Sequence, residues 1–256
     1  MNVDKIAHIA AYAGKIMLKS GAEIYRVEET ITRIGNSYGI FSIVAFVTLN
    51  VIIVSASDEC GQTISVIKRV RHRTLDLEKI ARVNNLSRNI KKNNYSLYRV
   101  EMKLNKIESA SSYNLKITLL FSGLATTFFC FAFGGNIKDS LVSFFIGMLI
   151  NLISRSLNFL RANEFFINIL CGAMAALIAL ISINFNIGSN RDTIIISSIM
   201  LLVPGLSITN AIRDTIAGDL ISGISRGIEA FLVAVAIAIG TGVVLKLWSI
   251  IGGIGL

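Results

Sequence analysis

Polar and charged side chains gather in one otherwise apolar part of the sequence, between Leu201 and Gly223. This stretch contains the only proline of the chain, Pro204, which Gly205 follows directly. Because proline removes a backbone donor and clashes with the preceding turn, we expect a helix to break or kink here. Inside a membrane, such a break survives only where protein or a water-filled cavity surrounds the freed backbone groups. The stretch therefore predicts either a transporter-type broken helix near the bilayer midplane or a proline kink that leads into an ordinary cytoplasmic loop.

The residues after this break have the chemistry of a carboxylate-binding site. Ser207 or Thr209 can cap the second half-helix, whose free amides and partial positive charge favour an anion. Asn210, Arg213 and Asp214 follow at i, i+3 and i+4, so they share one helix face. Arg213 can bind a carboxylate through two hydrogen bonds. We therefore predict that Ser207, Thr209, Asn210 and Arg213 contact a substrate.

Two acidic residues and a second helix extend this candidate site. Asp214 and Asp219 can hold an ammonium group, a proton or a cation, so we predict ion coupling for both. Asn151 begins a polar stripe that recurs at i+3, i+4 and i+7 on one face of a predicted membrane helix. The stripe either lines the same cavity, with Asn151 as a substrate contact, or forms the solvated end of its helix. In the same way, Arg213 and the two aspartates either bind ligands or decorate a cytoplasmic loop.

Composition divides the sequence into two parts. Of its 256 residues 53% are hydrophobic and 16% are charged, whereas roughly 25% of the residues in a soluble domain are charged. Nearly all of the net charge of +9 lies before Ile117, and long apolar runs follow. We therefore predict a cytoplasmic α/β domain over residues 1–112 and a transmembrane domain over residues 113–256. Because the basic residues are interleaved with acids and no nucleic-acid motif is present, we expect this front domain to face anionic lipid rather than nucleic acid.

Periodicity predicts the elements of the front domain. Apolar residues three and four apart indicate an amphipathic helix over Val3–Ser37, broken near Gly21. A segment rich in β-branched and aromatic residues predicts a hairpin, whose first strand is long enough to be two, with Asn50 near the bend. Helical periodicity then returns. The expected strands and helices are Phe41–Ser55, Thr63–Val70, Asp76–Ile90 and Leu97–Ser112.

Five apolar runs in the second part each come near the roughly 20 residues that cross a bilayer. They lie between residues 116 and 138, 139 and 155, 164 and 191, 192 and 213, and 224 and 248. With the basic front inside, five further basic residues also fall inside, as the positive-inside tendency favours: Lys116, Arg155, Arg161, Arg213 and Arg226. The sequence thus predicts an α-helical polytopic membrane protein with five transmembrane helices, a cytoplasmic N-terminus and a C-terminus outside.

Patterns that would hold a metal or a cofactor are absent from the sequence. Cys60, Cys130 and Cys171 are isolated, without the spacing of a zinc site or a redox pair. We find no phosphate-cradling glycine loop, nucleophile elbow or metal-ligand cluster. We therefore expect no cofactor, no metal and no catalytic residue, and a membrane enzyme with a hydrolytic front domain is the weakest alternative.

Two segments carry a family resemblance. KSGAEIYRVEETITRIGNSYG, over residues 19–39, and VPGLSITNAIRDTIAGDLISGISRGIEA, over residues 203–230, resemble segments of the threonine/serine exporter family of bacterial membrane proteins. Their order and separation match too, so the resemblance covers nearly the whole chain. The positions that match the family pattern are Pro204, Gly205, Asn210, Arg213, Asp214, Gly218, Asp219, Ser222 and Gly223.

This resemblance implies a cytoplasmic N-terminal domain followed by membrane helices, and export of small amino acids such as threonine and serine. Relatives that are split into two subunits are linked to export of the dicarboxylate succinate. Single-chain members carry a further group of membrane helices after the region matched here. The chain therefore resembles the larger subunit of the two-subunit form, which implies a small integral-membrane partner subunit of about four or five spans and an oligomeric assembly.

The sequence leaves two functions of different classes open. The first is a subunit of a secondary exporter of small carboxylate metabolites, in which the substrate carboxylate meets the helix start after Pro204 and an aspartate couples transport to protons. The second is a membrane-anchored cytoplasmic sensor or scaffold without transport activity, whose apolar helices only anchor and oligomerise.

Overall fold

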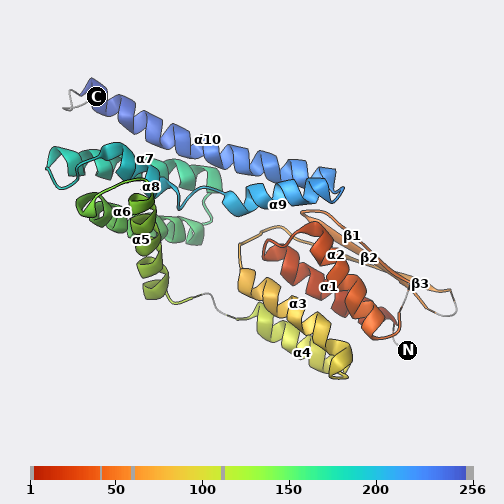
Figure 1. Ribbon diagram of the computed structural model, residues 1–256. Helices are drawn as coiled ribbons and strands as arrows, with labels where there is room; N and C mark the ends of the chain where they lie inside the picture. Colours follow the sequence, from red (N-terminus) through yellow and green to blue (C-terminus); the bar gives the residue numbers. More distant parts are fainter. Residues whose placement is uncertain (1–2, 41, 59–60, 111–112, 252–256) are drawn as a thin grey trace. The chain divides into compact units, whose positions relative to one another are not determined.

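The computed structural model describes residues 3–40, 42–58, 61–110 and 113–251 (Figure 1). The chain forms two compact units, Met1–Ser111 with Ser207–Gly227, and Ser112–Leu206 with Ile228–Leu256. The sequence places Ser207–Gly227 in the transmembrane domain, whereas the structure groups this segment with the front of the chain. Phe41, Cys60 and Ser112, which the sequence predictions name, lie outside the described residues, as do the C-terminal residues 252–256.

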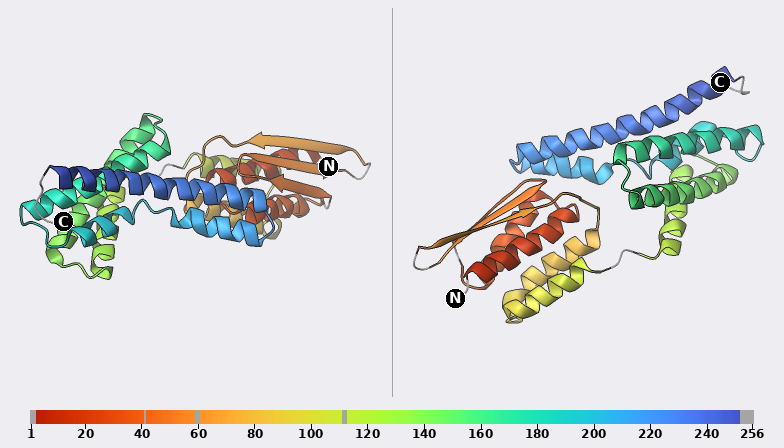
Figure 2. Two further views of the ribbon diagram at one scale, coloured as in Figure 1. Left: turned by 90° about the horizontal axis from the view of Figure 1, so that it is seen from above. Right: turned by 180° about the vertical axis from the view of Figure 1, so that it is seen from behind.

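The first unit has three layers, with α1 and α2 between a sheet and a second pair of helices (Figures 1 and 2). The sheet is antiparallel in the order β1-β2-β3, and its inner face packs on α1 and α2. As the sequence predicts, the first helix breaks at Gly21, where φ is +87°, and the long first strand divides at Asn50. The elements are α1 Val3–Lys19, α2 Ile24–Ser37, β1 Ile43–Val47, β2 Val51–Ser57, β3 Thr63–Arg69, α3 Leu77–Lys92 and α4 Leu97–Glu108.

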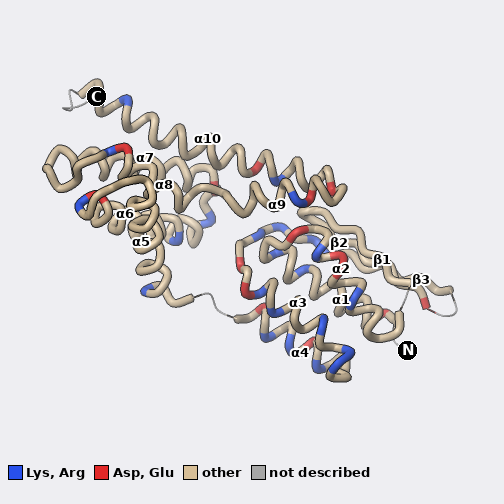
Figure 3. Tube along the Cα trace, viewed as in Figure 1, with Lys and Arg blue, Asp and Glu red and all other residues tan. Residues whose placement is uncertain are grey.

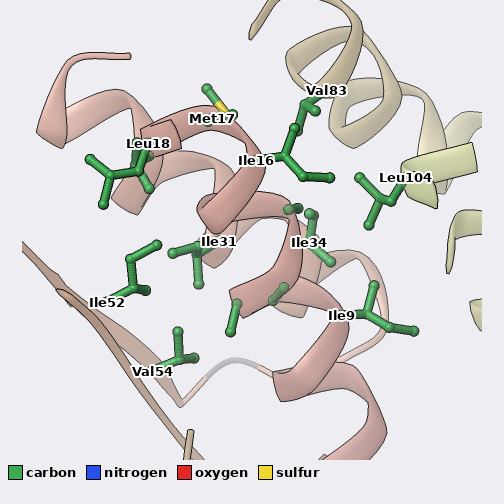
Figure 4. Packing of buried hydrophobic residues seen from close by; sticks show 14 of the residues in the cluster. Ile9, Ile16, Met17, Leu18, Ile31, Ile34, Ile52, Val54, Val83 and Leu104 are labelled. Carbon is green, nitrogen blue, oxygen red and sulfur yellow. The ribbon is translucent and has the colours of Figure 1, made fainter. Parts of the chain in front are cut away.

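The core of this unit surrounds α1 (Figure 4). Ile16 of α1 and Ile31 of α2 are buried, and Ile52 of β2 covers them from the sheet. On the other side, Val83 of α3 and Leu104 of α4 close the core. Burying each such side chain contributes roughly 1.5–3 kcal/mol. Since α1 is covered from both sides, its small and apolar residues are buried around most of its circumference.

The second unit is made of long apolar helices that carry few charges (Figure 3). Four helices of the described residues are long and apolar enough to cross a membrane: α5 Leu115–Ala132, α6 Ile137–Phe159, α7 Glu164–Asn184 and α10 Leu220–Ile250. The first turns of α10, up to Gly227, belong to the first unit, and the remainder of that helix belongs to the second. These four helices match the first, second, third and fifth of the predicted spans.

The predicted fourth span, between Asp192 and Arg213, is not a continuous helix. It consists of α8, Arg191–Ile199, and α9, Gly205–Ile216, which have 9 and 12 residues and are separated at Pro204. Both helices are shorter than the roughly 20 residues that a crossing needs. In the part of the chain that the structure describes, four helices have membrane length, so the predicted total of five crossings is not confirmed.

Small residues and hydroxyl groups hold the helices of the second unit together. Gly147 of α6 faces Thr126 of α5, and the Thr126 hydroxyl donates to the carbonyl oxygen of Ser143 at 2.7 Å. Ser143 in turn shares a hydrogen bond with Ser197 of α8 at 2.9 Å. Because lipid is as apolar as a leucine side chain, membrane helices associate through such close packing and polar contacts rather than through the hydrophobic effect.

Gly240 provides a test of this packing. A Cβ at this position would collide with the backbone carbonyl of Ile169 on α7, whereas a Cβ at Gly242, two residues along the same helix, would meet open space. We expect Gly240→Ala to destabilise the protein by roughly 1–3 kcal/mol, since backbone cannot move aside cheaply, and Gly242→Ala to be neutral. Melting temperatures of the purified variants measure the difference, and equal values for both would refute the close approach.

Candidate functional site

Helix α9 meets the turn between α1 and α2 inside the first unit. Asn210 Nδ2 donates to the carbonyl oxygen of Gly21 at 3.1 Å. Arg213 Nη1 donates to Oε1 of Glu23 at 2.8 Å, and these two residues are 190 positions apart in the sequence. The two segments that carry the family resemblance, residues 19–39 and 203–230, are therefore in direct contact.

Asp214 lies at the centre of this contact, which we call the α1–α2 turn cluster: Gly21, Ala22, Glu23, Ile24, Asn210, Arg213, Asp214 and Arg226. The Oδ1 atom of Asp214 accepts from the backbone N–H of Ile24, the first residue of α2, at 3.0 Å. Glu23 precedes α2 and makes no side-chain capping bond of its own. Asp214 therefore caps α2 from a distant helix and places negative charge at its N-terminus, where the helix dipole favours an anion.

Arg226 completes the cluster from α10. Its Nε lies 2.9 Å from Oδ2 of Asp214, and its Nη2 donates to the carbonyl oxygen of Ala22 at 2.6 Å. The side chains of Asp214 and Arg226 are 0% and 7% exposed, so the ion pair is removed from water. A buried charge is tolerated when it is both paired and hydrogen-bonded, and both conditions hold here.

The ion pair between Arg213 and Glu23 is more exposed to solvent than the pair between Asp214 and Arg226. The Glu23 carboxylate is 7% exposed and lies between two guanidinium groups, those of Arg213 at 2.8 Å and Arg26 at 3.4 Å. Glu23 and Arg26 are three positions apart, a spacing that brings side chains together on a helix. The Arg213 side chain remains 54% exposed, so water screens its interaction with Glu23.

Burial and pairing shift the pKa values of these carboxyl groups in opposite directions. Burial raises the pKa of Asp214, and the Ile24 N–H and the Arg226 charge offset this only in part. Burial also acts to raise the pKa of Glu23, but its hydrogen bonds and the charges of its arginine neighbours outweigh it, so that pKa is lowered. Glu23 is thus held as a carboxylate, whereas Asp214 depends on Arg226 for its charge.

A second pair of carboxyl groups lies beside the cluster. Glu28 of α2 accepts from the backbone N–H of Val47 at 3.0 Å. Burial raises the pKa of Glu28, and the charge of the nearby Asp219 raises it further. Burial likewise raises the pKa of Asp219, which follows α9 and is half-buried. Both groups are therefore easier to protonate than ordinary carboxyl groups.

The other predicted site residues lie outside this cluster. α9 begins at Gly205, directly after Pro204, so Ser207 and Thr209 lie within the helix and are exposed. Their predicted role as helix caps is wrong, because a capping residue must precede the first helical residue. Asn151 is half-buried on α6 in the second unit, and the cluster of the first unit does not include it.

Sequence reasoning missed three partners of the predicted residues. It treats Arg226 only as one of the basic residues that fall inside, does not single out Glu23, and treats the α1–α2 turn only as a break. One signal was available for the Asp214–Arg226 pair. Arg226 stands at the start of a long apolar helix, twelve residues after Asp214, and an arginine in apolar surroundings needs an acidic partner. Backbone carbonyl partners such as those of Gly21 and Ala22 leave no signal in a sequence.

Comparison with known proteins decides the family. A family model described as "Putative threonine/serine exporter" matches residues 8–248, which is most of the chain. The chain belongs to this threonine/serine exporter family. It is therefore a multi-pass membrane protein of a transporter family.

Individual relatives differ in length. The chain is 25% identical over 249 residues to the "Probable succinate transporter subunit YjjP" of Escherichia coli, and the match covers 96% of both proteins. It is 25% identical over 253 residues to the "Threonine/serine exporter" of Corynebacterium glutamicum, covering 96% of this chain but 52% of that protein. A "Probable threonine/serine exporter" of Mycobacterium tuberculosis is 21% identical, with 46% of its length covered. No solved structure matches.

Replacement of Arg226 tests the buried ion pair. Arg226→Ala leaves Asp214 without its cation in a site that is 0% exposed, so we expect a loss of about 3–5 kcal/mol. Because Asp214 also caps α2, hydrogen exchange at the Ile24 amide should accelerate. Lys246→Ala on the same helix is the control. Undiminished protection of Ile24 in Arg226→Ala would contradict the capping role of the pair.

The lowered pKa of Glu23 predicts a pH dependence with a definite sign. A carboxyl group whose folded-state pKa is lowered stabilises the fold above its unfolded pKa, and this contribution is lost as the pH falls through the folded value. We expect Glu23→Gln to lower the free energy of unfolding by about 1 kcal/mol at neutral pH. This difference should vanish as the pH falls below about 4. Melting temperatures of wild type and variant across this range measure it, with the exposed Glu29→Gln as the control.

Proposed function

We propose that this chain is a subunit of a secondary exporter that moves small carboxylate metabolites across the cytoplasmic membrane. The substrates we propose are threonine and serine, or a dicarboxylate such as succinate. Family membership supports export, and the names of the relatives support both substrate classes. The match to nearly the full length of a relative named as a subunit supports the further proposal that a small integral-membrane protein is its partner.

The exposed Arg213–Glu23 pair supports a binding role for Arg213. Its Nη1 already contacts one carboxylate oxygen, Oε1 of Glu23, at 2.8 Å, and the guanidinium can bind a substrate carboxylate through two such bonds. Because Arg213 is 54% exposed, a substrate carboxylate reaches it from solvent and displaces Glu23. Thr209 is exposed one turn before Arg213 on α9, and we propose its hydroxyl and that of Ser207 as further contacts, while Asn210 fixes α9 to the turn. We propose Asn151 as a contact from α6.

Asp219 and Asp214 have different roles in the proposed ion coupling. Asp219 is half-buried, its pKa is raised by burial, and Glu28 lies close enough for the two charges to interact. Like charges that share a site favour binding of a proton, so this pair takes up a proton more readily than separate carboxylates would. Protonation of Asp214 would weaken its buried ion pair with Arg226 and so loosen α9 from α10.

The proposed topology keeps five crossings. α8, the interruption at Pro204 and the first turn of α9 together supply the fourth, with the freed backbone groups satisfied by protein, as lipid-facing backbone cannot be. The positive-inside tendency then supports a cytoplasmic N-terminus and a C-terminus outside. In this arrangement the front of the chain, including the α1–α2 turn cluster, is in the cytoplasm, where the substrate is loaded.

Efflux measurements test the role of Arg213. We expect Arg213→Ala to reduce efflux from loaded cells tenfold or more, because hydrogen bonds to a charged group contribute roughly 1.5–3 kcal/mol each. Arg213→Lys should retain part of the activity, and Arg88→Ala, an exposed arginine of α3, should retain all of it. Membrane abundance must be equal in all strains. Full efflux by Arg213→Ala would remove this residue from the mechanism.

The function as a whole is tested with a substrate panel. Efflux of amino acids and dicarboxylic acids is measured in cells and in liposomes, with and without the proposed partner, a small membrane protein encoded beside this chain. Transport of one substrate class that requires both proteins supports the proposal. No transport of any panel member by the reconstituted pair would favour the alternative, a membrane-anchored sensor or scaffold.

A further inference from the structure

The outer face of the three-stranded sheet carries an exposed apolar row. Phe46 of β1 pairs with Ile53 of β2, and Ile53 pairs with Ile67 of β3, so the three side chains form one line across the sheet. Phe46 is 56% and Ile67 is 65% exposed, and Val44 on the same face is 67% exposed. The inner face of the sheet is covered by α1 and α2, but this outer row is open to solvent in the described residues of the first unit (Figure 2). An exposed row of large apolar side chains marks a surface that something else covers.

Basic residues lie on one side of this row, further along β3. Arg69 lies on the same face as Ile67, because strand residues two apart point to the same side, and it pairs with Val51 in the next row. The chain then leaves the strand through Arg71 and His72, which are also exposed. On the other side of the row, Ser55 and Ser65 make the outer face of β2 and β3 polar. The outer face is thus apolar at its centre and positively charged at the end of β3.

The charged end lies close to the beginning of a membrane helix. Val47, the residue after Phe46, donates its N–H to Glu28, and Glu28 is near enough to Asp219 for their charges to interact. Asp219 directly precedes Leu220, the first residue of α10, which is long and apolar enough to span a bilayer. The part of the row formed by Phe46 therefore lies near the turn between α9 and α10, within the first unit.

We propose that the outer sheet face, formed by Val44, Phe46, Ile53, Ile67 and Arg69 together with Arg71, rests on an anionic lipid leaflet. Apolar side chains enter the headgroup boundary while the arginines bind lipid phosphates, because an anionic surface attracts basic residues. A second copy of the chain fits less well. Two such faces would bring arginines together, and the few apolar side chains of the row are far fewer than the roughly 20–30 residues per side of a stable interface.

Fluorescence quenching in the full-length protein tests this surface. Phe46→Trp is placed in a Trp248→Phe background, which leaves a single tryptophan, and the protein is reconstituted into lipid discs. The discs contain phosphatidylcholine with or without phosphatidylglycerol, brominated on the acyl chains. We expect bromine to quench the fluorescence of the Phe46→Trp variant in the anionic discs. This quenching should be lost in the neutral discs, at high salt, and when Arg69→Gln and Arg71→Gln are added to the variant.

Two further variants make the outcome decisive. Ile67→Trp repeats the measurement from β3 if Phe46→Trp misfolds, and Tyr98→Trp reports from the exposed side of α4, in the layer away from the sheet. Quenching of the Phe46→Trp variant no stronger than that of the Tyr98→Trp variant would overturn the proposal. Protection of the Phe46→Trp fluorophore from both brominated lipid and aqueous acrylamide would also overturn it, because protein rather than lipid would then cover the face.

Discussion

One carboxylate, that of Asp214, determines how the first unit is assembled. It supplies the acceptor that α2 lacks at its own beginning, and at the same time it neutralises the buried Arg226 of α10. Charge removed from water is costly unless it is paired and hydrogen-bonded, so neither residue can be moved without the other. The α1–α2 turn, α9 and the first turns of α10 consequently behave as one body. Any motion that separates α9 from the turn has to break the hydrogen bond from the Ile24 N–H to Asp214.

The two ion pairs of the cluster differ in exposure, and this difference gives them different physical roles. Asp214 and Arg226 are almost fully buried, so their attraction is strong and their separation is costly. Arg213 faces water on one side, where its pairing with Glu23 is screened and contributes little to stability. In the function proposed here, the buried pair is the fixed framework and Arg213 is the cation that exchanges its carboxylate partner.

The helices of the second unit associate by a different principle from that of the first unit. In the first unit, isoleucine and leucine side chains fill a core between helices and sheet, and their removal from water stabilises the fold. Between membrane-length helices, glycine and hydroxyl residues such as Gly147, Thr126 and Ser143 allow close approach instead. Their hydrogen bonds also satisfy polar groups that lipid cannot solvate. The family relationship shows that this combination of units belongs to a transporter family.

The local sequence determined the elements of this protein and their boundaries. Gly21 broke the first helix because only glycine adopts φ of +87° without strain, Asn50 divided the long strand, and Pro204 separated α8 from α9. Four apolar runs became membrane-length helices for the same local reason, their length and hydropathy. The segments that carry the resemblance also identified the family, because the order of residue types survives where overall identity is low.

Only the tertiary structure decided what the charged residues contact. Arg213 and Asp214 are predictable as a polar face, but their partners Glu23 and Ile24 lie 190 residues away, and one of those partners is a backbone amide. The sequence also suggested a pocket at membrane depth, whereas the structure groups Ser207–Gly227 with the front unit. Periodicity reports which face of a helix is polar, since that depends on neighbours in the chain. It cannot report which distant element meets that face, because chain topology and the burial of charge decide that together.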